Sequence, residues 1–259
     1  MIDNNYYREY RAFLGFTNQN DVKIYFGAKD LSPKVDLTYI DSLNKRLHSI
    51  VEKINTVANA SIRTNNLDDF KIKHIDEIFE ILVSAGILPQ LNNQGRRPEQ
   101  VYYSWMRGYV FSNYFLNALS KVFETPLEQI ELIGDDDLKN IETFKRTPKA
   151  DLQLTVNNSE KIRIEMQTGF TGINDIKQHK VLEAKRVKQE INISTIAIHF
   201  DLYNGQVAFI KLDDIEENNM NWITRQQMEG QTVFNIDQTY FNWKLTEEPP
   251  KYQQIIKDI

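Results

Sequence analysis

Two runs of alternating polar and apolar residues decide the fold of this chain. The first is ADLQLTV at residues 150–156, and the second is KIRIEMQ at residues 161–167. Alternation with a period of two predicts β-strands that each bury one face. The intervening NNSE at residues 157–160 consists of turn-forming residue types, so the two strands are expected to form a hairpin.

The polar face of this hairpin carries the residues of chemical interest. Successive side chains of a strand point to opposite faces, so the apolar residues of the second run share one face while Glu165 and Gln167 lie on the other. With the right register, Asp151 of the first strand lies on the same polar side as Glu165. Two carboxylates that converge at strand ends form a hard oxygen site that suits Mg²⁺.

The rest of the chain supplies helices and further strands around the hairpin. Apolar residues spaced three and four apart predict helices, and short apolar runs bounded by turn residues predict strands. In chain order we expect helices over 39–57, 67–85 and 99–124, the hairpin, a lysine- and arginine-rich helix over 173–190, and strands over 193–202, 207–212 and 232–236. This order predicts a mixed α/β (α+β) fold, in which helices flank a central mixed sheet and an N-terminal helical region packs on it.

Three segments follow from this outline. Residues 1–98 form the N-terminal helical region, residues 99–215 the core, and residues 216–259 a C-terminal extension packed on the core. No composition shift marks a firm boundary, and a chain of 259 residues also fits one large domain.

Composition excludes several classes of protein. The chain has no cysteine, so disulfides, thiolate metal sites and cysteine nucleophiles are excluded, and a cytoplasmic location is expected. No apolar stretch approaches the ~18 residues that would cross a bilayer, so no membrane contact is expected. Glycine-rich dinucleotide motifs, phosphate loops and Gly-x-Ser-x-Gly elbows do not occur in the sequence, so no nucleotide cofactor is expected.

The charges are unevenly distributed along the chain. The formal net charge of −5 argues against a nucleic-acid partner at first. However, residues 139–190 hold 11 Lys and Arg against 7 Asp and Glu, a net +4, and residues 209–259 hold 5 against 9, a net −4. A basic cleft on an acidic body is therefore compatible with the sequence.

The stretch from Pro148 to Gln167 resembles the PD-(D/E)xK nuclease superfamily, in its type II restriction endonuclease-like members. That pattern has an Asp at the start of one strand and Glu-x-Lys on the next, within a core of helix–strand–strand–helix–strand. Here Pro148 stands three positions before Asp151 instead of beside it, and Gln167 replaces the lysine. Glu-x-Gln variants occur in some restriction endonucleases and in transposase-associated relatives of this superfamily. The resemblance covers about residues 99–212.

The resemblance implies a site for Mg²⁺. By it, Asp151, Glu165 and the backbone carbonyl of Met166 would hold the ion, and Gln167 would orient the attacking water or contact the scissile phosphate. An amide cannot take up or release a proton at neutral pH. Lys180, or Lys177, would supply the missing positive charge from the following helix.

An acidic residue of the preceding helix often completes such sites, and Glu99 is the candidate in this chain. The implied activity is Mg²⁺-dependent, sequence-specific hydrolysis of double-stranded DNA by a type II restriction endonuclease. A palindromic target would call for a homodimer. The candidate DNA-binding residues are Arg96, Arg97, Lys149, Lys177 and Lys185.

Other interpretations stay open. A nuclease of a mobile element or phage would share this site without sequence-specific cutting. A catalytically silent nucleic-acid-binding protein would retain Gln167 as the mark of a decayed site. In an unrelated α/β protein, Asp151 would be a turn residue, and Glu165 would form cross-strand ion pairs with its basic neighbours.

Overall fold

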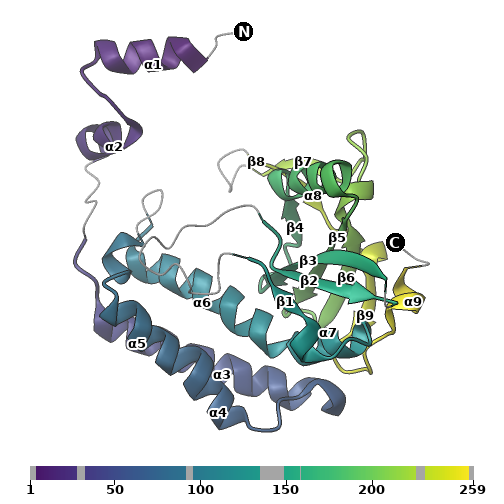
Figure 1. Ribbon diagram of the computed structural model, residues 1–259. Helices are drawn as coiled ribbons and strands as arrows, with labels where there is room; N and C mark the ends of the chain where they lie inside the picture. Colours follow the sequence, from purple (N-terminus) through teal and green to yellow (C-terminus); the bar gives the residue numbers. More distant parts are fainter. Residues whose placement is uncertain are drawn as a thin grey trace.

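The computed structural model describes residues 4–27, 33–91, 96–134, 149–157, 159–225 and 231–256. A six-stranded mixed sheet, with strand order β1-β2-β3-β5-β6-β9, lies between helices, and a three-stranded sheet, β4-β8-β7, stands beside it (Figure 1). The expected mixed α/β architecture is therefore confirmed. The strands are β1 (Glu131–Leu132), β2 (Leu152–Val156), β3 (Glu160–Gly169), β4 (Asp175–Lys177), β5 (Ser194–Asp201), β6 (Gln206–Lys211), β7 (Trp222–Arg225), β8 (Gln231–Asn235) and β9 (Phe241–Lys244).

The predicted hairpin is present as β2 and β3. The two strands pair antiparallel, with Leu152 opposite Ile164 and Val156 opposite Glu160. The other side of β3 pairs in parallel with β5 from Ile162 to Gly169. Because β3 has a neighbour on both sides, it is an interior strand. The alternation of its side chains then determines which helix each residue faces.

Helices cover the two faces of this sheet. The helices are α1 (Asn4–Phe13), α2 (Gln19–Gly27), α3 (Leu37–Val57), α4 (Leu67–Lys71), the π-helical turn η2 (Ile72–Asp76), α5 (Glu77–Ser84), α6 (Pro98–Tyr114), α7 (Leu116–Val122), α8 (Gln178–Ile191) and α9 (Tyr252–Ile255). Short 3₁₀ turns occur at η1 (Ala60–Ile62), η3 (Leu88–Gln90), η4 (Leu127–Gln129), η5 (Leu212–Asp214) and η7 (Gln238–Tyr240).

Two apolar clusters show how these layers pack. The larger cluster extends from Ile40 to Ile255 and joins α3, α6, α7 and one face of the sheet, including Ile162 and Ile164. The smaller one joins α8, through Val181 and Ala184, to the other face and to the three-stranded sheet. Residues of all three segments expected from the sequence contribute to the larger cluster. No helix in the described ranges is long and apolar enough to span a membrane.

Two predicted helices have different bounds in the structure. The helix expected over 173–190 begins at Gln178, because Asp175–Lys177 forms strand β4 with Ile176 opposite Phe234 of β8. The helix expected over 99–124 is interrupted at Phe115, which ends α6 and precedes α7. The Phe115 ring stacks on Phe200 of β5 at 4.0 Å between centroids, so packing against the sheet accompanies the break.

Candidate active site

Asp151 lies one residue before β2, where the hairpin opens. Its N–H donates to the carbonyl of Ile164 at 3.0 Å, and its own carbonyl accepts from the N–H groups of Ile133 and Gly134, both at 3.0 Å. The carboxylate Oδ2 accepts from the backbone N–H of Met166 at 2.7 Å. The carboxylate of Asp151 is therefore held against the peptide that joins Glu165 to Met166.

Glu165 is buried on the α8 side of β3, with 5% of its surface exposed. Its Oε2 accepts from the Lys180 ammonium at 2.9 Å, and that side chain is itself only 18% exposed. The same ammonium lies 3.4 Å from the carbonyl of Lys149, just before Asp151. A buried carboxylate is costly without an opposite charge, and Lys180, in the first turn of α8, supplies one.

The register places the two carboxylates next to each other along the hairpin. Leu152 opposes Ile164, so the next positions outward are Asp151 and Glu165. We expected both side chains on one polar side of the hairpin. In the structure β2 begins only at Leu152, and the Asp151 side chain accepts from the Met166 N–H beside the end of that strand. The Asp151 carboxylate therefore lies next to the peptide that follows Glu165.

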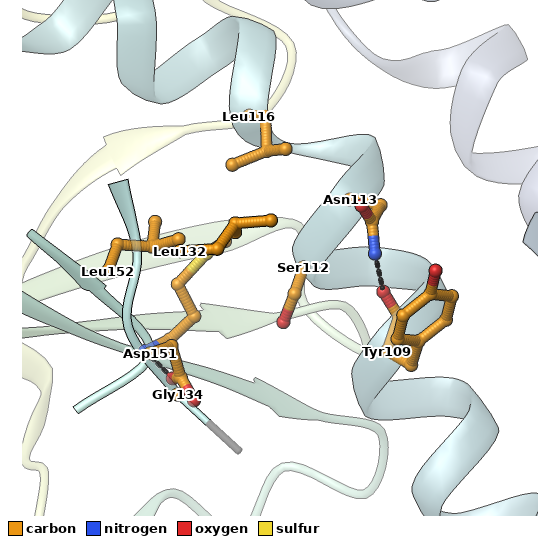
Figure 2. Close-up of a pocket in the computed structure, with 9 residues that line it drawn as sticks. Tyr109, Ser112, Asn113, Leu116, Leu132, Gly134, Asp151 and Leu152 are labelled. Carbon is orange, nitrogen blue, oxygen red and sulfur yellow. Dashed lines mark hydrogen bonds between the residues drawn. The ribbon is translucent and has the colours of Figure 1, made fainter. Parts of the chain in front are cut away.

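A small cavity of about 110 Å³ lies on the α6 side of Asp151. Figure 2 shows Asp151 and Gly134 at one end of it, with Tyr109 and Asn113 of α6 at the other. Three leucine side chains and Met166 line it between these two ends. Asp151 therefore has an apolar wall on this side and the Glu165 peptide on the other, an environment that strengthens electrostatic interactions of its carboxylate.

A larger cleft of about 570 Å³ begins where β3 ends. Gln167 lines it two positions after Glu165, and Lys180 lines it from α8. Gln167 is half-buried, and it lies on the same face of β3 as Glu165. Gln167, at the position where the superfamily pattern has lysine, and Lys180, which contacts Glu165, therefore line the same cleft.

The walls of this cleft are cationic. Arg107 of α6, Lys177 of β4, Lys180 of α8 and Arg225 of β7 line it, together with His179. Burial lowers the pKa of His179, and the charges of Lys177 and Lys180 lower it further, as expected in a region of positive potential. Such a cleft favours an anionic ligand.

One carboxylate, Asp175, is found among the described residues of the cleft wall. Arg225 neutralises it through two hydrogen bonds, Nε to Oδ2 at 2.8 Å and Nη2 to Oδ1 at 3.0 Å. The side-chain amide of Asn235 also donates to Oδ1 at 3.0 Å. The charge of Asp175 is therefore matched by Arg225 within the cleft wall.

Glu99 does not join this group. Its fully buried carboxylate accepts from the backbone N–H of Asp36 at 2.7 Å and from Arg97, through Nε at 3.1 Å and Nη2 at 3.0 Å. These contacts tie the start of α6 to the start of α3. Glu99 lines neither cavity described above, so the residue expected to complete the site has a structural role at the N-terminus of its helix.

The expected DNA-binding residues are scattered. Lys177 lies in the cleft wall, and Lys149 is exposed beside Asp151. Arg96 is exposed, and Arg97 is bound to Glu99. Lys185 is half-buried on α8 and lines neither cavity. Pro148, part of the motif that carries the resemblance, lies outside the described residues.

Two residues of the cleft wall, Arg107 and His199, are not among the site residues predicted from the sequence. His199 is buried, lines the cleft wall, and has its Nε2 2.8 Å from the Asn174 side-chain oxygen. Arg107 is the one cation inside the strongly apolar α6 sequence PEQVYYSWMRGYVFSNY. A charge at that place in a buried helix is the signal that could have identified it.

Within the described ranges, no group of three or more His, Asp or Glu side chains gathers as a metal site. Two carboxylates with a peptide between them fit Mg²⁺ nonetheless, because this ion uses one or two protein carboxylates together with waters and substrate phosphates. No protein-family model matches the sequence, and no curated protein matches it.

Proposed function

We propose that this chain is a Mg²⁺-dependent endodeoxyribonuclease, similar to the type II restriction endonucleases of the PD-(D/E)xK superfamily, that cuts double-stranded DNA. The observation that carries the proposal is the contact of Lys180 with Glu165. The chain has glutamine at position 167, where the superfamily pattern has lysine, and an ammonium from α8 reaches the motif glutamate instead.

The donor groups determine where the ion would bind. Asp151 and Glu165 would hold it, with the Met166 carbonyl as the third protein oxygen expected from the resemblance. When bound there, Mg²⁺ would lower the pKa of a water molecule and offset the negative charge of the phosphate under attack.

The side chains of this chain do the rest. The Lys180 ammonium holds Glu165 in place through their ion pair, and it adds positive charge where negative charge develops on the phosphate. Gln167 donates or accepts hydrogen bonds that position water or phosphate, and it transfers no proton. The cationic cleft wall binds the DNA backbone. In-line attack of water would leave a 5′-phosphate and a 3′-hydroxyl.

Sequence-specific cutting of a two-fold symmetric target would be performed by a homodimer, each protomer cutting one strand. The alternative, a nuclease of a mobile element or phage, would use the same residues but cut without a fixed sequence. The two differ in the fragments they leave, so one assay separates them.

The assay incubates the purified protein with plasmid and phage DNA, with and without Mg²⁺. Three variants remove the proposed groups at nearly constant shape: Asp151→Asn, Glu165→Gln and Lys180→Met. Each has an exposed control of the same type, namely Asp41→Asn, Glu190→Gln and Lys45→Met. We expect discrete Mg²⁺-dependent fragments, a loss of more than about 100-fold in the three site variants, and no change in the controls.

The possible outcomes separate the interpretations. Diffuse nicking that disappears in the site variants would favour the alternative, a nuclease of a mobile element or phage that cuts without a fixed sequence. DNA binding without cleavage by any divalent metal would favour the catalytically silent protein. Cleavage that survives Asp151→Asn and Glu165→Gln would overturn the assignment of the site.

A further inference from the structure

Arg107 projects from α6 into the wall of the cleft, opposite the end of β3. The Tyr103 ring centroid lies 5.1 Å from its Cζ, and the Phe170 ring centroid lies 4.7 Å from it. Tyr103 is one turn earlier on α6, and Phe170 directly follows β3. Two rings from two elements therefore fix the direction of the guanidinium.

This guanidinium has no carboxylate partner among the described residues. Its Nε–H is buried and makes no hydrogen bond. Burial lowers the pKa of Arg107, and no acidic residue is among the groups that counteract this shift. A half-buried cation with an unsatisfied buried donor is costly, and such a group in a native fold calls for an explanation such as a ligand.

The surroundings indicate which ligand. The aromatic rings cover the guanidinium, so a ligand can bind only through the N–H groups in its plane. Two such N–H groups side by side match two oxygens of a phosphate. Gly108 also lines the cleft, and a side chain at that position would meet no atom within 4 Å, so there is room beside Arg107. The charge of Asp175 is already taken by Arg225, so no described acid of the wall competes with an incoming anion.

We propose that Arg107, held by Tyr103 and Phe170, binds a backbone phosphate of the DNA strand that occupies the cleft. The inference rests on the proposed function, because it takes DNA as the occupant. Arg107 lines the cleft from α6, whereas Lys180 reaches Glu165 from α8, so the proposal assigns to Arg107 a phosphate other than the one that is cut. Arg107 is thus a binding and positioning residue, and it is not expected to take part in bond breaking.

The test measures binding of a short fluorescein-labelled DNA duplex by anisotropy in EDTA, so that cleavage does not enter. Salt titrations compare the wild type with Arg107→Ala, Arg107→Gln and Arg107→Lys. The matched control is Arg46→Ala, an exposed arginine of α3. Loss of one phosphate contact should reduce the slope of log K against log salt by about 0.9 and weaken binding roughly 10-fold.

Arg107→Lys should keep the slope, because the charge remains, but lose affinity, because an ammonium cannot bind two oxygens in one plane. Thermal unfolding of every variant identifies those that fail to fold, and Arg107→Gln serves if Arg107→Ala is one of them. An unchanged slope in folded Arg107→Ala and Arg107→Gln, with only a lower melting temperature, would overturn the inference and leave Arg107 as a packing residue.

The same measurement separates this inference from the nuclease proposal. A reduced slope in a protein that cuts no DNA would support the phosphate contact while the nuclease activity fails. An unchanged slope in a protein that cuts DNA would support the nuclease activity while the phosphate contact fails. Inorganic phosphate alone serves as a second probe. If it raises the wild-type melting temperature while the DNA slope stays unchanged in Arg107→Ala, the site binds free phosphate and the inference fails.

Discussion

At the scale of single residues, the contact between Glu165 and Lys180 places an ammonium from α8 against a buried carboxylate of β3. The carboxylate and the ammonium are both largely removed from water, and their hydrogen bond is 2.9 Å long. Removing one member of such a pair costs far more than the pair contributes, because the other charge stays buried. Lys180 is therefore expected to stabilise the fold, in addition to its role in the proposed chemistry.

His199 makes the stability of the protein depend on pH. Burial lowers its pKa to about 4 from 6.5, because the charged form is poorly solvated in the core. The folded state therefore favours the neutral ring. The contribution of this group is complete above pH 6.5 and is lost as the pH falls toward 4, up to about 3 kcal/mol. We expect urea unfolding to show this fall, with a shallower pH dependence in His199→Gln.

The matched control for that measurement is His48→Gln, whose ring is partly exposed and contacts Asp76. Part of the fall should persist in His199→Gln, because burial also lowers the pKa of His74 to about 4. A profile identical in the wild type and His199→Gln would show that His199 is not the group responsible.

At the scale of elements, α8 brings Lys180 to the site with its first turn and ends at Ile191, where its C-cap residue is Asn192. That residue has left-handed backbone angles, φ 56° and ψ 34°, and its N–H donates to the Lys188 carbonyl at 3.0 Å. Asparagine and glycine tolerate this conformation, whereas a β-carbon without a polar group disfavours it. We expect Asn192→Ala to lower the free energy of unfolding by about 1 kcal/mol, and Asn192→Gly to leave it within about 0.5 kcal/mol.

Urea unfolding measures both values, and Gln189→Ala, at an exposed helical position of α8, is the control. Because the change lies at the far end of α8 from Lys180, DNA cleavage should not respond to it. Equal stability of Asn192→Ala and Asn192→Gly would contradict the expected strain.

The elements also show how far sequence reasoning reaches. The hairpin, α3 and β5 were predictable, because each has a local period that matches its structure over many residues. Strand β4 was not, since its three residues gain strand geometry only by pairing with β8, about 60 positions later. The break at Phe115 likewise depends on Phe200.

In the candidate site, too, some features were predictable from the local sequence and others were not. The positions of Asp151, Glu165 and Gln167 follow from alternation within the hairpin, but the turn of the Asp151 side chain to Met166 depends on where β2 begins. The role of Glu99 depends on Asp36, which sequence spacing does not bring near it. Contacts between distant segments are what the local pattern leaves undetermined.

At the scale of the whole molecule, the described N-terminal helices differ from the rest of the chain. Helices α1 and α2 lie apart from the sheet (Figure 1), and their large side chains are exposed, with Phe13 at 94% and Tyr25 at 75%. The larger apolar cluster begins only at Val35 and Ile40 and extends to Ile255. Stability should therefore depend on the C-terminal end much more than on the N-terminal one.

Removal of residues 1–33 should change the free energy of unfolding by less than about 0.5 kcal/mol. The point variant Ile255→Ala should lower it by about 2–4 kcal/mol, because it leaves a cavity in the core. Chemical denaturation of the truncated and full-length chains makes this comparison. A large loss on truncation would show that the N-terminal helices contribute to the stability of the body.

The hairpin of β2 and β3, and helix α8 that connects β3 to β5, also have a consequence for the order of folding. Asp151, Glu165 and Lys180 all belong to one continuous stretch, so closing the loops between them costs little chain entropy. Arg107 reaches the cleft from α6, which is separated from this stretch by α7, η4 and β1. Short-range contacts form faster than long-range ones, so we expect the two carboxylates and their counter-cation to meet before α6 closes over the sheet. Glu165 would then already be paired with Lys180 when the apolar residues of α6 cover the sheet.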